Sequence, residues 1–120
     1  MATILTADDT ATMRQMISFT LSSAGHQVMQ ASDGTEALAL ARTRKFDLVI
    51  ADINMPNMDG ISLVKSLREL PDYKFTPILM LTTESQAEKR QEGRSAGATG
   101  WIVKPFNPEQ LLTIVKKVLG

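Results

Sequence analysis

Polar side chains that could hold a cation and a phosphoryl group stand at the ends of predicted strands in this sequence. Asp8 and Asp9 directly follow one short apolar segment, and Asp52 directly follows another. Thr82 and Lys104 follow two further segments of the same kind. Because the carboxyl ends of parallel strands meet at one edge of a sheet, we expect these five side chains to gather at one site. Carboxylates, a hydroxyl and an ammonium group together suit a divalent cation and a phosphoryl group.

Each of these residues also has an ordinary structural interpretation. An aspartate after a strand often caps the next helix, and for Asp9 this alternative stays open. Asp52 precedes a turn, where aspartate is common, Thr82 suits a strand end, and lysines such as Lys104 are usually solvated. The joint placement at four strand ends is more specific than any single residue. Because clustered carboxylates repel one another, we expect Asp8→Asn or Asp52→Asn to raise the melting temperature without Mg²⁺.

Short apolar segments alternate with helical patterns along the 120 residues. Each helical pattern follows a predicted strand, and two helix starts carry capping signals, Asp33 with Glu36 and Asn107 with Pro108 and Gln110. The predicted strands are Thr3–Ala7, Gln27–Ala31, Asp47–Ala51, Pro77–Leu81 and Thr99–Val103.

The element order βαβαβαβαβα predicts an α/β fold with a five-stranded parallel sheet, doubly wound as (βα)5, in one domain over residues 1–120. Half of a dinucleotide-binding domain would have the same order, but it needs G-x-G-x-x-G where this chain reads DDTATM. A G-x-x-x-x-G-K-[ST] loop is also absent from the sequence. The fourth helix, over Ser85–Ala96, has no large apolar residue, so we expect it to be the least stable helix.

Composition narrows the classes of function. Hydrophobic residues make up 43% and charged residues 22% of the chain, as in ordinary soluble domains. Thirteen basic and thirteen acidic residues balance, so no net charge argues for a nucleic acid or membrane partner. The absence of cysteine excludes disulfides and thiolate metal sites. The N-terminus turns acidic too early for a signal peptide, and no apolar run approaches the roughly 20 residues of a membrane helix, so we expect a cytoplasmic protein.

The stretches ADDTATMR, DLVIADINMPNMDG, ILMLTTES and GATGWIVKPF give the chain an end-to-end resemblance to a known family. It resembles the receiver domains of two-component response regulators, most of all the single-domain chemotaxis regulators of the CheY type. The resemblance implies a flavodoxin-like strand order 2-1-3-4-5. It also implies phosphorylation of Asp52 and a Mg²⁺ ion bound by Asp9 directly, by Asp8 largely through water, by Asp52, and by the backbone carbonyl of Asn54.

The resemblance implies a switch as well as a site. Thr82 would hydrogen-bond the phosphoryl group, and Lys104 would pair with it, next to a cis Lys104-Pro105 peptide bond. Thr82 would move toward the phosphoryl group, and the aromatic ring of Trp101 would then rotate inward behind it. Tyrosine or phenylalanine is more usual at this position, so we expect the bulkier tryptophan to change the strength of the coupling.

The same resemblance implies partners and a limited phosphoryl lifetime. Asn54 and Glu84 would flank the site and tune hydrolysis, which gives a short-lived phosphoprotein. A histidine kinase would be the phosphodonor, and the fourth helix, fifth strand and fifth helix of a monomer would bind a downstream protein. The flagellar motor switch is the preferred target.

Three alternatives remain beside this signalling switch. A phosphorelay shuttle would use the same residues and would pass the phosphoryl group to a histidine of another protein. A receiver that is never phosphorylated would not need the full set of site residues. A Mg²⁺-dependent aspartyl phosphatase, the one true enzyme considered, commonly carries a second aspartate two residues after its nucleophile, where this chain has Asn54.

Overall fold

The protein folds around a parallel sheet of five strands in the order β2-β1-β3-β4-β5. The computed structural model describes residues 1–83 and 87–120. The strands are β1 Thr3–Ala7, β2 Gln27–Ala31, β3 Leu48–Asp52, β4 Ile78–Thr83 and β5 Gly100–Lys104. The helices are α1 Ala11–Ser23, α2 Gly34–Thr43, α3 Gly60–Glu69, α4 Ala87–Ala96 and α5 Pro108–Leu119, with a 3₁₀ turn at Pro71–Tyr73. The predicted α/β class, the element order and the strand order 2-1-3-4-5 are confirmed.

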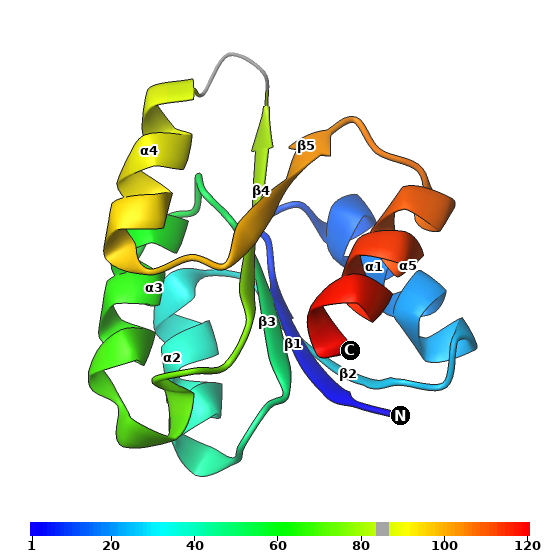
Figure 1. Ribbon diagram of the computed structural model, residues 1–120, viewed down its shortest axis with the longest axis horizontal. Coiled ribbons are helices and arrows are strands. Elements are labelled where there is room, and N and C mark those ends of the chain that lie inside the picture. The colour runs from blue at the N-terminus through cyan, green and yellow to red at the C-terminus, as the bar shows by residue number, and fades with distance from the viewer. Residues whose placement is uncertain (84–86) are drawn as a thin grey trace.

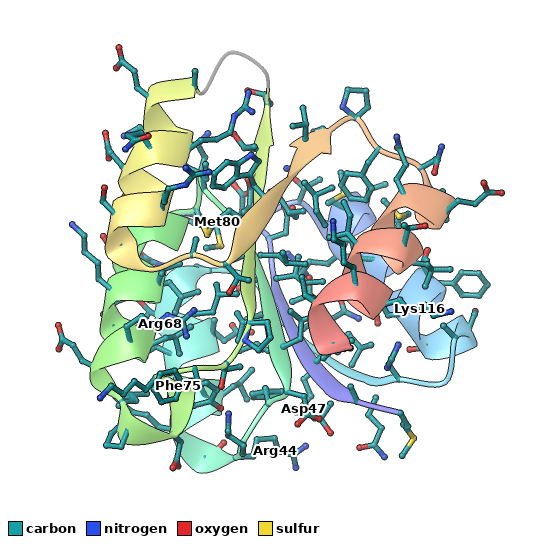
Figure 2. The ribbon with its side chains drawn as sticks, in the orientation of Figure 1. Arg44, Asp47, Arg68, Phe75, Met80 and Lys116 are labelled. Atoms are coloured by element: carbon teal, nitrogen blue, oxygen red, sulfur yellow. The ribbon has the colours of Figure 1, made fainter. Side chains whose placement is uncertain are left out.

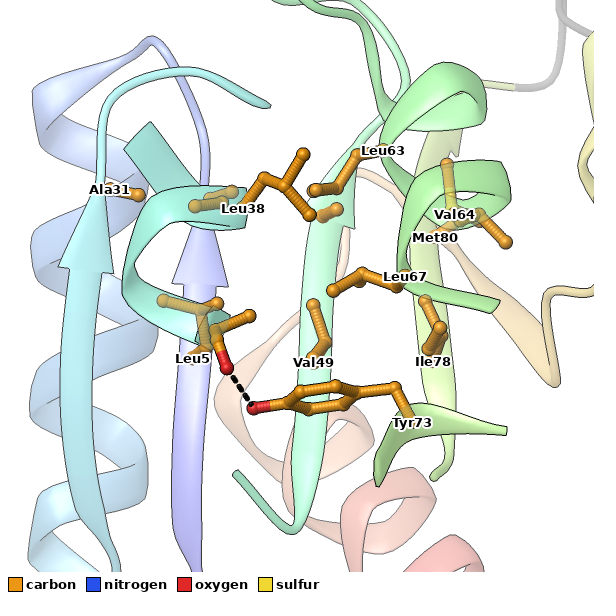
Figure 3. Packing of buried hydrophobic residues seen from close by; sticks show 14 of the residues in the cluster. Leu5, Ala31, Leu38, Val49, Leu63, Val64, Leu67, Tyr73, Ile78 and Met80 are labelled. Atoms are coloured by element: carbon orange, nitrogen blue, oxygen red, sulfur yellow. Dashed lines mark hydrogen bonds between the residues drawn. The ribbon is translucent and has the colours of Figure 1, made fainter. Parts of the chain in front are cut away.

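Helices cover both faces of the sheet, with α1 and α5 on one face and α2, α3 and α4 on the other (Figure 1). Successive strand residues point to opposite faces, so each strand contributes to two separate cores. One core packs strand residues such as Leu5 and Val49 against Leu67 of α3 (Figure 3). The other packs Ile4 and its neighbours against Leu21 of α1. Burial on both faces explains the continuous apolar runs of the central strands β3 and β4.

Three strands run one or two residues further than the sequence predicts. The segments expected at 47–51, 77–81 and 99–103 are observed at 48–52, 78–83 and 100–104. Asp52, Thr82 and Lys104 therefore belong to strands instead of following them. The reason is that the backbone ladder continues past the last apolar residue: Asp52 pairs with Leu81, and Thr83 pairs with Lys104.

The predicted helix caps are present. The side chains of Asp33 and Asn107 each accept a hydrogen bond of 2.8 Å from the backbone amide three residues further on, and the capping box of α5 is complete. The structure describes α4 from Ala87, so the predicted start at Ser85 lies outside the described residues. In α4 only Gly93 is buried, and its low stability stays a prediction. No helix in the described ranges is long and apolar enough to cross a membrane.

Arg68 of α3 hydrogen-bonds to the connections that lead into β4 and β5 (Figure 2). Its Nη1 donates to the carbonyl oxygens of Tyr73 at 2.6 Å and Thr76 at 2.7 Å, and its Nη2 donates to that of Gly97 at 2.8 Å. Burial lowers the pKa of this guanidinium. These bonds hold the amino ends of β4 and β5 against α3, which fixes the strands whose carboxyl ends carry Thr82 and Lys104.

Candidate functional site

Three aspartates, called the acidic cluster below, meet at the carboxyl edge of the sheet. Asp8 follows β1 and Asp52 ends β3, two strands that pair through Ala7 and Ala51. Asp8, Asp9 and Asp52 each offer a carboxylate oxygen, and these oxygens all lie within 4.8 Å of one another. Asp8 is fully buried, Asp52 is 7% exposed, and Asp9 is exposed. The predicted gathering of these carboxylates is confirmed.

Lys104 places one positive charge inside this cluster. Its Nζ lies 3.2 Å from Oδ2 of Asp52 and 3.5 Å from Oδ2 of Asp8. Burial raises the pKa of Asp52, Lys104 lowers it, and the charge of Asp8 raises it again, with a raised pKa as the result. The single positive charge of Lys104 therefore does not balance the negative charges of the three carboxylates.

The acidic cluster fits a bound Mg²⁺ ion. Oδ1 of Asp8 accepts a hydrogen bond of 2.8 Å from the backbone amide of Thr10, but its buried Oδ2 accepts none from the described residues. Mg²⁺ prefers oxygen ligands, and one or two carboxylates suffice because the ion keeps several waters. Such an ion would satisfy this buried oxygen and reduce the repulsion between the carboxylates.

The alternative interpretation of Asp9 as a helix cap is wrong. The residue that caps α1 is Thr10, and its side chain makes no capping hydrogen bond. The backbone turns at this point because the Asp8 carboxylate bonds the amide two residues further on, as aspartates often do in turns. The carboxylate of Asp9 is therefore left on the exposed side of the cluster.

Thr82 lies on β4, which pairs with β3, and Trp101 lies on β5, the edge strand beyond β4. Thr82 is fully buried, and its hydroxyl donates to the carbonyl oxygen of Thr83 at 3.2 Å. Trp101 is partly buried on β5 and packs against the core that includes Leu67. The guanidinium carbon of Arg94, on α4, lies 4.9 Å from the centroid of a Trp101 ring. The indole therefore reports on the contact between α4 and β5.

The remaining predicted residues divide into described and undescribed positions. Asn54 is exposed in the loop after β3, and its backbone amide lowers the pKa of the Asp52 carboxylate. The Lys104-Pro105 peptide bond is cis, as the resemblance implied. Glu84 lies outside the described residues.

Two residues of the site, Arg14 and Gly60, were not identified from the sequence. Nη1 of Arg14, on α1, donates to the backbone carbonyl of Asp8 at 2.6 Å, and no local sequence pattern predicts this contact. Gly60 begins α3 against the end of β3, where a Cβ atom would lie 2.2 Å from the carbonyl oxygen of Asp52. The signal for Gly60 was available, because a glycine directly after a capping aspartate suggests a close backbone approach.

Comparison with known proteins decides the family. The profile of the response regulator receiver domain matches residues 4–116. The chain belongs to this family. Receiver domains are signalling switches of two-component systems rather than classical enzymes, and an acidic cluster of this kind is typical of their Mg²⁺ site.

The relatives include both chemotaxis proteins and a transcriptional regulator. Chemotaxis protein CheY-3 of Vibrio cholerae is 39% identical over 96% of this chain and 89% of its own length. The structure of chemotaxis response regulator CheY4 of Vibrio cholerae matches with a TM-score of 0.94 and 56% identity over 98% of both chains. Transcriptional regulatory protein ResD of Bacillus subtilis is 36% identical over 97% of this chain, which covers 47% of ResD. The comparisons thus establish the receiver domain and suggest a chemotaxis role.

Proposed function

We propose that this protein is a phosphorylation-activated response regulator that accepts a phosphoryl group from a histidine kinase on Asp52. The observation that carries the proposal is the position of this carboxylate in a receiver domain: it ends β3 within the acidic cluster, 3.2 Å from the ammonium group of Lys104. The Asp52 side chain is 11% exposed, so a donor phosphoryl group can approach it from the carboxyl edge of the sheet.

The proposed transfer is a nucleophilic displacement at phosphorus. A carboxylate oxygen of Asp52 attacks the phosphorus atom, the phosphorus–nitrogen bond of phosphohistidine breaks, and the released imidazole takes up a proton. Lys104 pairs with one phosphoryl oxygen, and the hydroxyl of Thr82 donates to another. Mg²⁺, held by the acidic cluster and the backbone carbonyl of Asn54, supplies charge neutralisation when it is bound.

We assign the loss of the phosphoryl group to hydrolysis tuned by Asn54 and Glu84. Polar side chains beside the acyl phosphate can admit or orient the attacking water. The phosphoprotein is then short-lived, and bulky or basic residues at these two positions lengthen its lifetime. An unchanged rate of decay in such a double variant would refute this assignment.

The proposed output is protein binding by the surface of α4, β5 and α5. Phosphorylation shifts the population toward an active state through Thr82 and Trp101, because only the active state gains the new phosphoryl contacts. We propose the flagellar motor switch as the target, in the cytoplasm. The similarity to CheY-3 and CheY4, both named as chemotaxis proteins, supports this target over a transcriptional one.

The fluorescence of Trp101, the single tryptophan of the chain, tests the proposal. We expect one change on adding Mg²⁺ and a second on adding beryllofluoride, with the second step absent in Asp52→Asn. A second step of equal size in this variant would refute Asp52 as the acceptor. Capture of the motor switch protein only by the beryllofluoride form would support the target, and equal capture by both forms would refute switching.

A further inference from the structure

The loop between β3 and α3, residues 53–59, directly follows Asp52 and is fixed at both ends. The backbone amide of Ile53 donates to the carbonyl oxygen of Leu81 at 3.2 Å. The amide of Gly60 donates back to the carbonyl oxygen of Ile53 at 2.9 Å. These bonds hold the ends of the loop but leave its middle to other contacts.

The middle of the loop adopts a tight turn with an unusual backbone. The amide of Met58 donates to the carbonyl oxygen of Pro56 at 2.7 Å, which closes a three-residue turn around Asn57. Asn57 has a φ of 66°, the only positive φ of a non-glycine residue in the described ranges. Asparagine tolerates this conformation better than most residues, but a turn of this kind is strained and persists only where its surroundings fix it.

The surroundings that fix this turn are the first residues of α2. The amide of Gly34 donates to the carbonyl oxygen of Met58 at 3.1 Å. Nδ2 of Asn57 donates to Oδ2 of Asp33 at 2.8 Å. A Cβ atom on Gly34 would lie 2.3 Å from the Met58 carbonyl oxygen, so the close approach of the two segments requires glycine.

Asp33 uses its two carboxylate oxygens for two different tasks. Oδ1 accepts from the backbone amide of Glu36 at 2.8 Å and so caps α2. Oδ2 accepts from Asn57 and so holds the loop. Because the second bond adds nothing to the helix cap, its effect is on the loop.

We infer that Asp33 and Asn57 are positioning residues for the cation site, because their hydrogen bond sets loop 53–59 in the shape that presents the Asn54 backbone to the acidic cluster. The inference rests on the proposed function, which makes the Asn54 carbonyl a ligand. Only Ile53 separates Asn54 from Asp52 in the chain, so a displaced loop also disturbs the cluster. A preformed ligand lowers the entropy cost of binding the cation.

Variants at the two positions can separate the loop bond from the helix cap. Asp33→Ser keeps a good capping residue, but its single short hydroxyl cannot serve both Glu36 and Asn57. Asn57→Gly removes the side-chain donor and keeps the positive φ accessible. The double variant D33N/N57D exchanges donor and acceptor and restores the bond. Ser32→Ala is the matched control, because within residues 1–83 and 87–120 the Ser32 hydroxyl donates only to Glu36, at 3.1 Å.

Two measurements without any phosphodonor decide the inference. Hydrogen exchange of the metal-free protein should be faster in residues 54–58 in both single variants. The dissociation constant of Mg²⁺, from Trp101 fluorescence, should rise about threefold to tenfold, the effect of one lost hydrogen bond. D33N/N57D should recover most of both effects, and Ser32→Ala should show neither.

The outcomes separate this inference from the proposed function. Unchanged Mg²⁺ affinity in both single variants, even with a lower melting temperature, would reduce the bond to a purely structural role and overturn the inference. Failure of the exchange variant to recover affinity would also overturn it. A wild-type protein that binds Mg²⁺ but takes no phosphoryl group from acetyl phosphate would refute the proposed function alone.

Discussion

The charge of Asp52 should destabilise the metal-free protein, so Asp52→Asn should raise its melting temperature near neutral pH. The Asp52 side chain, 11% exposed, lies among two other carboxylates, with Lys104 as the nearby positive charge. Burial raises the pKa of Asp52, the attraction of Lys104 lowers it, and the repulsion of Asp8 raises it. The raised pKa means that the folded protein favours the protonated carboxyl group more than the unfolded chain does.

Opposing Coulomb energies set the size of the effect. At an effective dielectric constant of about 20, the attraction across 3.2 Å to Lys104 is about 5 kcal/mol. The repulsion between two carboxylates 4.8 Å apart, the outer limit in the cluster, is about 3 kcal/mol for each pair. Asp52 takes part in two such pairs, so the repulsion, about 6 to 7 kcal/mol, somewhat exceeds the attraction, and burial acts in the same direction. We expect Asp52→Asn to stabilise the protein by about 1 to 2 kcal/mol, or about 3 to 10 °C in melting temperature.

Thermal unfolding followed by circular dichroism in EDTA and in MgCl₂ tests this prediction. In EDTA the stability of the wild type should fall as the pH rises from 3.8 through the raised pKa of Asp52, and the variant should lack this loss. In saturating Mg²⁺ the order should reverse, because each tenfold excess over the dissociation constant stabilises the wild type by about 1.4 kcal/mol. Glu69→Gln, an exposed acid on α3, is the control. A lower melting temperature for Asp52→Asn in EDTA would refute the reasoning.

Three further predictions concern the same region. Lys104→Ala should lower the stability of the metal-free protein by about 1 to 3 kcal/mol in urea unfolding, because it leaves Asp52 without its positive neighbour. Hydrogen bonds from the Glu36 amide and then from Asn57 lower the pKa of Asp33. The contribution of Asp33 to the stability of the fold is therefore full above pH 3.8 and is lost as the pH falls through the lowered pKa. In an acid titration, the stability of Asp33→Ser should approach that of the wild type at low pH. Gly60→Ala should cost about 1 to 3 kcal/mol, since its Cβ would meet the carbonyl oxygen of Asp52, and a neutral effect on unfolding would contradict this contact.

Local signals explain why the fold could be predicted from the sequence. The continuous apolar run Ile78–Leu81 predicts a strand buried on both faces, and Asn107 with Gln110 predicts the start of α5. Once five strands alternate with five helices, parallel topology places Asp8 and Asp52 at one edge. The strand order came from the family resemblance, since alternation alone does not order the strands.

Contacts between distant segments explain what the sequence did not reveal. The hydrogen bond between Asp33 and Asn57 joins residues 24 apart in the chain, and no sequence pattern around either residue predicts the other as its partner. The bond from Arg14 to the carbonyl of Asp8 depends on the angle at which α1 leaves β1. The sequence predicts Asp52 after β3 because hydrophobicity identifies only the apolar residues of a strand. The backbone pairing with β4 continues through the polar residue Asp52, which ends the strand.

The identity of the phosphorylated residue is the most direct test of the account. The protein would be incubated with acetyl phosphate and Mg²⁺, and the acyl phosphate would be located by hydride reduction and peptide mass spectrometry. The account predicts one phosphoryl group, on Asp52, that requires Mg²⁺ and does not form in EDTA. A phosphoryl group on another residue, or none in the presence of Mg²⁺, would contradict it.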